Sequence, residues 1–294
     1  MIHICEVGPR DGLQNEKKKL TTDQKVTLIQ KLIDAGIKKI EAVSFVNPKV
    51  VPQMADAEAV MDKVPKTEGV TYAGLVLSRS GLERALQTDV DAIHVVTATS
   101  DEFNLKNARR TVQQSVEELT KVIEEGVRSG KTVNGVLGTS FGCPFSGNVP
   151  VERVLSVAEA FAKAGAKEIT LADTTGMANP TQVTDVVKTF QKTFKNDVEF
   201  GLHFHNTRGL GLANVLAGYL AGVRRFDSSI AGLGGCPFAP KAVGNVCTED
   251  MVNMFEKMGE QTNTDLPQLI ETAKWMETVM ERRLDGMLMK AGIA

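Results

Sequence analysis

One unit of apolar and polar positions recurs along this chain. A helix-like segment ends at Gly, one or two polar residues follow, and a short apolar strand begins. Copies run through residues 34–41, 163–170 and 220–227, with a looser copy at 88–94. Gly ends a helix readily because it adopts positive φ, which turns the chain back toward a strand. Helices and strands that alternate in this way predict a parallel sheet.

Eight apolar runs have the length and composition of strands. They centre on Ile4, Ala42, Leu75, Val95, Val136, Leu171, Leu202 and Ser228. Helical patterns fill the intervals and are clearest at Thr22–Leu32, Thr111–Val127 and Val151–Ala164. Eight strand–helix units within about 250 residues predict an α/β protein with a (β/α)8 TIM barrel. An open, doubly wound sheet is the alternative, and the count of eight strands disfavours it.

The final part of the chain, from about residue 262, predicts extra C-terminal helices. Trp275, Met276, Val279 and Met280 recur there at helical spacing. Such a stripe is typical of a packed core or an interface. No linker or low-complexity segment interrupts the sequence. We therefore expect one catalytic domain over residues 1–294, with a helical appendix at its end.

Composition narrows the class of protein. Apolar residues make up 42% of the 294 residues and charged residues 24%, which is typical of a globular protein. The net charge is −2 with both signs interspersed, so we expect neither a nucleic-acid partner nor a membrane-surface partner. No apolar stretch approaches the roughly 20 residues of a membrane span, and the first residues do not resemble a signal peptide.

The four cysteines, at positions 5, 143, 236 and 247, form no C-x-x-C pair. This pattern suits a reducing compartment better than a disulfide scaffold, so we expect a cytoplasmic protein.

Two histidines, His203 and His205, lie at positions i and i+2 of one predicted strand. In a strand they point to the same face, and a polar loop follows at the carboxyl end. Imidazole is a common ligand of divalent transition metals. Asp11 follows the first strand, and strand ends of a barrel meet at one rim. The alternatives are two hydrogen-bonded structural histidines and, for Asp11, an Asp-Gly turn.

Three further charged residues lie within predicted strands or at their ends. Arg10 could stabilise negative charge that develops on an oxygen, or form a salt bridge within the rim. Glu41 lies in an otherwise apolar strand and needs a partner, for which Arg10 is suitable; it would orient Arg10 or, less favourably, act as a base. Asp173 could be a supporting acid, a proton-transfer group or a helix N-cap.

A thiol, Cys236, follows the Gly-rich run Gly232–Gly235. Several glycines permit a mobile loop that could carry the thiol to a substrate. The tetrad Gly-Cys-Pro-Phe also occurs around Cys143, where that run is absent, so we expect Cys143 to be structural. Cys5 and Cys247 are expected to be small buried apolar residues.

Three residues on the C-terminal side of this loop have more modest structural interpretations. Asn245 could offer an amide oxygen to a metal, although Gly-Asn is also a turn signal. Glu249 and Asp250 open a predicted helix, where carboxylates suit the positive end of the helix dipole.

Three motifs together are similar to a known family. They are Ser229–Phe238, Gly8–Asn15 and His203–His205. Over essentially its whole length the chain resembles the 3-hydroxy-3-methylglutaryl-CoA lyases, which belong to the metal-dependent lyase and Claisen-condensing barrels. The first motif is highly specific to the lyases.

The resemblance implies a role for each matched residue. Asp11, His203, His205 and Asn245 would bind a divalent metal, Mg²⁺ or Mn²⁺. Arg10 would stabilise an enolate, Cys236 would be the catalytic thiol, and Glu41 and Asp173 would be supporting catalytic acids. Gln14, Asn15 and Glu249, together with Arg10, would contribute to the substrate site.

The implied reaction cleaves 3-hydroxy-3-methylglutaryl-CoA to acetoacetate and acetyl-CoA, a step of leucine breakdown. Many barrels dimerise, and the stripe around Trp275 could be the contact surface, so we also expect a homodimer or another homo-oligomer. One alternative is a lyase for a longer branched 3-hydroxyglutaryl-CoA. A Claisen-condensing synthase is disfavoured because condensation does not need the thiol, and a non-catalytic barrel is disfavoured by the intact set of site residues.

The chain departs from the family pattern in two places. It reads Asn206-Thr207-Arg208 after the histidines where the lyases read Asp-Thr-Tyr, which bears on substrate detail. Its end lacks the cysteine and the peroxisomal signal of animal forms, as we expect for a bacterial-type cytoplasmic enzyme.

Overall fold

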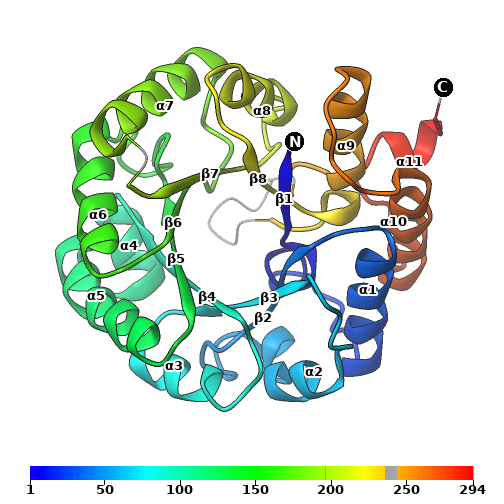
Figure 1. Cartoon of the computed structure of the whole chain (residues 1–294), viewed down its shortest axis with the longest axis horizontal. Helices are drawn as coiled ribbons and strands as arrows, with labels where there is room; N and C mark the ends of the chain where they lie inside the picture. The colour runs from blue at the N-terminus through cyan, green and yellow to red at the C-terminus, as the bar shows by residue number, and fades with distance from the viewer. Residues whose placement is uncertain (196, 236–243, 294) are drawn as a thin grey trace.

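The computed structural model describes residues 1–195, 197–235 and 244–293. In these residues eight strands form a closed barrel in the order of the sequence (Figure 1). The strands are β1 His3–Glu6, β2 Lys39–Ser44, β3 Thr71–Val76, β4 Ala92–Ala98, β5 Thr132–Gly138, β6 Glu168–Asp173, β7 Glu199–Phe204 and β8 Arg225–Ser228. Each predicted strand centre falls within one of them, so the TIM-barrel prediction is confirmed.

Helices follow the strands around the outside of the barrel (Figure 1). They are α1 Thr22–Asp34, α2 Ala57–Lys63, α3 Arg79–Ala85, α4 Asp101–Ala108, α5 Val112–Arg128, α6 Val151–Lys163, α7 Pro180–Phe194, α8 Gly211–Leu220 and α9 Thr248–Lys257. Beyond the barrel come α10 Leu266–Met280 and α11 Leu288–Ala291.

The barrel closes because β1 pairs in parallel with both β2 and β8. Cys5 is in register with Lys39 on one side, and His3 with Arg225 on the other. A sheet whose first and last strands pair has no edges, so the open doubly wound alternative is excluded.

Local sequence signals explain where the helices begin and end. Thr21 and Gln24 form a reciprocal capping box at the start of α1, so two otherwise unpaired backbone N–H groups are satisfied. In the three clear repeats the expected Gly follows each helix with positive φ, +89° at Gly36, +106° at Gly165 and +105° at Gly222. Most residues avoid this backbone region, so Gly is favoured at each return to a strand.

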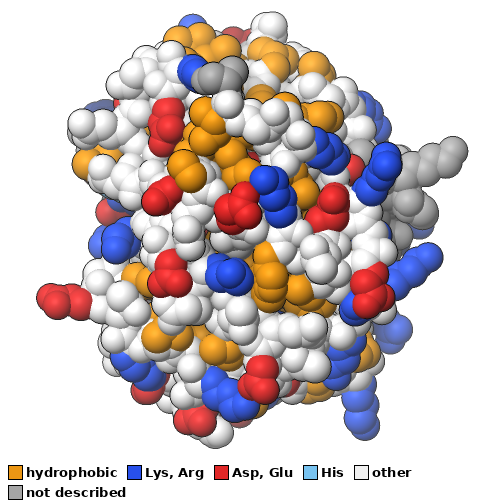
Figure 2. Space-filling view, turned by 90° about the vertical axis from the view of Figure 1, so that its right-hand side faces the viewer, with side chains coloured by type: hydrophobic (Ala, Val, Ile, Leu, Met, Phe, Trp, Pro, Cys, Tyr) orange, Lys and Arg blue, Asp and Glu red, His pale blue; other side chains and the backbone are white. Residues whose placement is uncertain are grey.

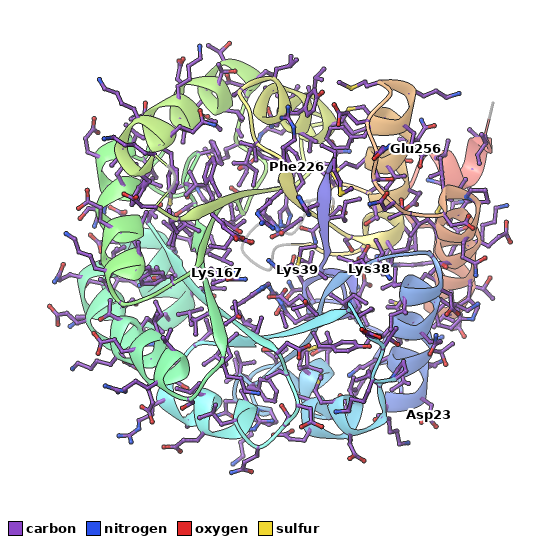
Figure 3. All side chains as sticks on the ribbon, viewed as in Figure 1. Asp23, Lys38, Lys39, Lys167, Phe226 and Glu256 are labelled. Atoms are coloured by element: carbon purple, nitrogen blue, oxygen red, sulfur yellow. The ribbon has the colours of Figure 1, made fainter. Side chains whose placement is uncertain are left out.

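The interior of the barrel is more polar than most TIM-barrel cores, which branched apolar residues fill. Lys39 Nζ on β2 donates to Glu168 Oε1 on β6, 2.9 Å away, and these strands stand on opposite sides of the barrel. Arg225 Nη2 lies 2.7 Å from Glu199 Oε2. Figure 3 places Lys39 within the ring of strands, with helix side chains outside it. The apolar core therefore lies mainly between the strands and the helices.

The predicted appendix is helical and packs on the side of the barrel. In α10, Met276 and Met280 are buried, and Lys31 Nζ of α1 lies 5.4 Å from the centre of the Trp275 ring. Figure 2 looks onto this side, where acidic, basic and apolar side chains are interspersed. That the whole chain is one domain remains a prediction. Within the described ranges, no helix has both the length and the apolar character needed to cross a bilayer.

Candidate active site

The turn after β1 places Arg10 and Asp11 at the carboxyl end of the barrel. Gly8–Gly12 forms a π-helical turn in which the N–H groups of Arg10, Asp11 and Gly12 all approach the carbonyl oxygen of Val7. The turn lies close to its neighbours, because a Cβ on Gly8 would come within 2.6 Å of Glu6 Oε1. This close packing leaves no room for a side chain at position 8.

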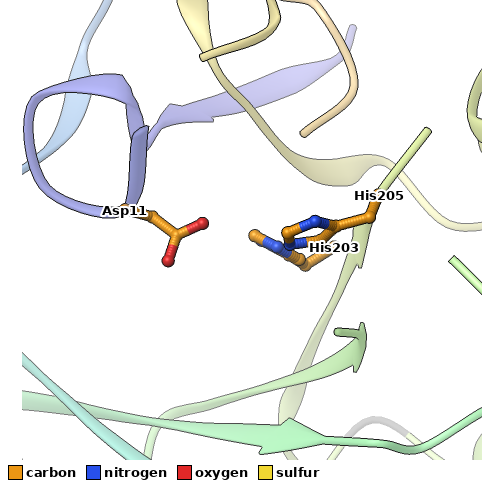
Figure 4. A group of neighbouring side chains, drawn as sticks. All are labelled: Asp11, His203 and His205. Atoms are coloured by element: carbon orange, nitrogen blue, oxygen red, sulfur yellow. The ribbon is translucent and has the colours of Figure 1, made fainter. Parts of the chain in front are cut away.

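His203 near the end of β7 and His205 just beyond it face Asp11 across the rim, as Figure 4 shows. The two ring centroids are 5.2 Å apart, and both side chains are buried. One ligand atom from each of these three residues lies within 4.8 Å of the other two. The prediction that Asp11 and both histidines lie close together at one rim is confirmed.

Asn245 adjoins this cluster. Its Nδ2 donates to Asp11 Oδ2 at 2.8 Å and to the carbonyl oxygen of Leu233 at 3.1 Å. Its Oδ1 is buried and accepts no hydrogen bond within the part of the chain that the structure describes. Two imidazoles and a carboxylate form a donor set that suits a divalent cation, and the unsatisfied amide oxygen belongs to a side chain bonded to that carboxylate. The residues present therefore fit the metal that the sequence predicts.

Asp227 on β8 supports the cluster, although it belongs to none of the motifs named above. His203 Nδ1 lies 3.2 Å from Asp227 Oδ2. A carboxylate on one ring nitrogen leaves the other, Nε2, for a metal and fixes the orientation of the ring. Burial alone would lower the pKa of His203, but the hydrogen bond and charge of Asp227 raise it above its ordinary value. The one feature of the sequence that could have indicated Asp227 is an acidic residue within a predicted strand.

Arg10 links the cluster to a buried acid. Its Nη1 donates to Asp11 Oδ1 at 2.8 Å, and its Nε donates to Glu41 Oε2 at 2.5 Å. Glu41 is 1% exposed, and its other oxygen, Oε1, lies 2.8 Å from Nδ1 of His94 on β4. The predicted pairing of Glu41 with Arg10 is confirmed. His94 belongs to none of the sequence motifs and was not among the predicted site residues.

These contacts determine which carboxyl groups are ionised. Burial disfavours the ionised form of Glu41, but the Arg10 guanidinium and His94 outweigh it and lower the pKa to about 2. Burial likewise opposes ionisation of Asp11, and Arg10 and the two imidazoles bring its pKa below the ordinary value. Both groups are therefore carboxylates at neutral pH, with Arg10 between them.

The comparisons with known proteins agree with this site. The sequence matches the HMGL-like family over residues 1–276. The chain belongs to that family. It is 41% identical to a hydroxymethylglutaryl-CoA lyase of Bacillus subtilis, in a match that covers 96% of this chain and 94% of the relative. It is 40% identical to an (R)-citramalyl-CoA lyase of Chloroflexus aurantiacus, over 99% of this chain and 95% of that one.

A solved structure gives the same picture. The HMG-CoA lyase from Acenitobacter baumannii, solved in complex with coenzyme A and 3-methylmalate, has a TM-score of 0.95 and 42% identity. The match covers 99% of this chain and 95% of that one.

Gln14 and Asn15 extend the HMGL-like site along the turn after β1. Gln14 Nε2 donates to Asp11 Oδ1 at 3.1 Å, and Asn15 Nδ2 donates to the carbonyl oxygen of Gly235 at 3.1 Å. The second bond ties this turn to the Gly-rich run that precedes Cys236. Cys236 itself lies outside the described residues. Substrate contacts by Gln14 and Asn15 stay predictions.

Asp173 ends β6, and its carboxylate binds backbone. Oδ1 accepts from the N–H of Met177 at 2.7 Å, and Oδ2 from the N–H of Ala178 at 3.0 Å. The cap of α7 is Asn179, so the N-cap hypothesis for Asp173 is wrong. Burial raises the pKa of Asp173 to about 6 despite these bonds. A role as a supporting acid stays a prediction.

Glu249 lies beneath the Gly-rich segment. It is fully buried in the first turn of α9, and its Oε2 accepts from the N–H of Ala231 at 3.0 Å. Burial raises its pKa to about 7. Its expected place in the substrate site stays a prediction, and its observed contact is with the backbone before the loop.

The described cysteines are buried, as predicted. Cys143 Sγ accepts from Ser100 Oγ at 3.0 Å and from the N–H of Phe145 at 3.4 Å, which fits a structural role. Burial raises the pKa of Cys5 and of Cys247 well above the ordinary value, so both stay thiols at neutral pH.

Proposed function

We propose that this protein cleaves (S)-3-hydroxy-3-methylglutaryl-CoA to acetoacetate and acetyl-CoA, as a carbon–carbon lyase. One observation carries the proposal: in an HMGL-like chain, Asp11, His203 and His205 converge on one rim with Arg10 directly beside Asp11. The lyases among its relatives support the same reaction class.

The cation would be held by Asp11, His203, His205 and Asn245. Their two oxygens and two imidazoles are better suited to Mg²⁺ or Mn²⁺ than to Zn²⁺, which prefers a closed tetrahedral site in structural roles. A cation held by these residues would act as a Lewis acid that makes the substrate hydroxyl more acidic. Asp227 holds His203 in the orientation that leaves Nε2 for this purpose.

The remaining chemistry belongs to the side chains. Asp11, or a water beside it, takes the proton of the C3 hydroxyl, and this oxygen becomes the ketone of acetoacetate. The C2–C3 bond breaks, and its electron pair forms the enolate of the thioester. Arg10 stabilises the negative charge on the enolate oxygen, because its guanidinium is already fixed by Glu41. Cys236 then gives a proton to C2, which completes acetyl-CoA.

The test is to incubate the purified protein with this thioester and Mg²⁺ or Mn²⁺, with and without EDTA, and to follow acetoacetate. We expect release that EDTA abolishes and that added metal restores. No release from metal-loaded protein would overturn the proposal.

A substrate panel separates related activities. It contains citramalyl-CoA, because a relative of similar identity is named for that substrate, and a longer branched 3-hydroxyglutaryl-CoA. A condensation assay with acetyl-CoA and a 2-oxo acid tests the synthase alternative. We expect kcat/KM to be highest for 3-hydroxy-3-methylglutaryl-CoA.

We infer a cytoplasmic homodimer or other homo-oligomer that has an acyl-CoA as its substrate and acts in leucine breakdown. The buried free thiols support a reducing compartment. The half-buried Trp275 on α10 is a candidate for the contact surface. Light scattering coupled to gel filtration measures the assembly, and a monomer mass of 31.7 kDa would contradict it.

A further inference from the structure

His94 is a buried polar residue to which the chemistry above gives no role. It lies on β4 with 4% of its surface exposed, among strands that enclose the barrel interior. Its Nδ1 is 2.8 Å from Glu41 Oε1. Its Nε2 makes no hydrogen bond to any residue that the structure describes. The contact with Glu41 is therefore the one hydrogen bond of this ring in the described chain.

The direction of this hydrogen bond follows from the charge of Glu41. An ionised carboxylate can only accept, so Nδ1 of His94 must carry the hydrogen. Glu41 then has one oxygen for each neighbour: Oε1 accepts from His94, and Oε2 accepts from Arg10 Nε while lying 2.5 Å from Arg10 Nη2.

Holding both oxygens matters because a glutamate carboxylate turns easily about its last torsion, which has a broad energy profile. With Oε1 free, the carboxylate can rotate, and Arg10 loses the fixed acceptor that sets its guanidinium plane. Arg10 also donates to Asp11, so a turned guanidinium would change its direction toward the reacting oxygen. Electrostatic stabilisation depends on such preorganisation of the donor.

We propose that His94 is a positioning residue that acts through Glu41 to hold Arg10 in the orientation needed to stabilise the enolate. The inference rests on the proposed lyase function, in which Arg10 faces the oxygen of the thioester.

The test compares His94→Leu, which removes the donor, with His94→Asn, whose Nδ2 occupies nearly the place of the imidazole Nδ1. Val95→Ala is the control, because Val95 is fully buried on the opposite face of the same strand. We expect His94→Leu to lower kcat roughly 10- to 100-fold, the usual effect of losing a residue that orients a functional group. We expect KM to stay within about threefold and His94→Asn to recover most of kcat.

Val95→Ala should lower the melting temperature and leave kcat near the wild-type value. If His94→Leu does not fold, His94→Gln replaces it, because its amide nitrogen lies one bond further out than Nδ1. The proposal would be overturned by a wild-type kcat in His94→Leu or His94→Gln. It would also be overturned if His94→Asn lost as much kcat as that variant.

A second measurement does not depend on turnover. Hydrogen exchange at the Arg10 Nε–H, followed by NMR, should be slow in the wild type and in His94→Asn, and faster in His94→Leu. If the wild type cleaves no 3-hydroxy-3-methylglutaryl-CoA but exchange behaves in this way, the proposed function fails and the positioning role stands. If the wild type is active and the Arg10 Nε–H exchanges equally slowly in His94→Leu, the positioning role is wrong and the proposed function stands.

Discussion

Replacing Arg10 by Met should damage folding and catalysis by separable amounts. Arg10 and Glu41 form a buried ion pair with N–O distances of 2.5 Å, and Glu41 is 1% exposed. Burial opposes ionisation of Glu41, but Arg10 and His94 outweigh it and lower the pKa from 4.5 to about 2. At about 1.4 kcal/mol per pKa unit, this difference corresponds to about 3 kcal/mol of stabilisation at neutral pH. This figure agrees with the typical cost of removing one partner of a buried ion pair, which is about 3–5 kcal/mol.

The double variant Arg10→Met with Glu41→Gln separates the two effects. It leaves no unpaired charge at position 41, so we expect it to regain the part of the free energy of unfolding that was lost through Glu41, while kcat stays low. Urea unfolding can be followed by the fluorescence of Trp275, the chain's one tryptophan, in EDTA so that metal binding does not contribute. Recovery of kcat in the double variant would refute the role of Arg10 in catalysis.

The stability loss in Arg10→Met should also depend on pH. A carboxyl group with a lowered pKa stabilises the folded protein at pH values above its ordinary pKa, and this contribution disappears as pH falls from about 5 toward 2. The difference between wild type and variant should therefore shrink as the solution is acidified. A difference that is constant between pH 7 and pH 3 would show that lost packing, and not charge, causes it.

Three further predictions concern the surroundings of the site. Asp227→Ala should weaken Mn²⁺ binding roughly 10- to 100-fold, because His203 loses the group that orients it; an unchanged titration would contradict this. Cys236→Ser should lower turnover severely while Mn²⁺ binding persists, and unchanged turnover would remove this thiol from the mechanism. Glu249 has a pKa raised by burial to about 7, so wild-type stability falls as pH rises from about 4.5 to 7. Glu249→Gln should then be more stable than wild type at pH 8, by up to about 3 kcal/mol, and equal at pH 4; equal differences at both pH values would rule this out.

The barrel could be predicted because its signals are local. Each strand and each helix end is determined by a few neighbouring residues, as the positive φ values at Gly36, Gly165 and Gly222 illustrate. The convergence of Asp11 with His203 and His205 followed from one general rule, that the carboxyl ends of barrel strands share a rim.

The supporting residues were not predictable in the same way. His94 and Asp227 lie within strands and acquire their roles only through partners on other strands, so the sequence around them contains no motif. Asp173 illustrates a second limit, because its partners are backbone N–H groups whose positions depend on the loop conformation. Contacts across the barrel and loop geometry are properties of the assembled fold.

The pairing of β1 with β8 has a consequence for how the protein reaches its working state. Asp11 follows the first strand, whereas its hydrogen-bonded partner Asn245 stands 234 positions later. The two halves of the site therefore meet only when the barrel closes along this seam, which encloses the longest loop, and so the largest loop-closure entropy, of the strand pairings in the described barrel. During synthesis or refolding, compact intermediates can gain most of their helices without any metal affinity. Recovery of metal binding is thus a direct reporter of ring closure, distinct from the recovery of helical structure.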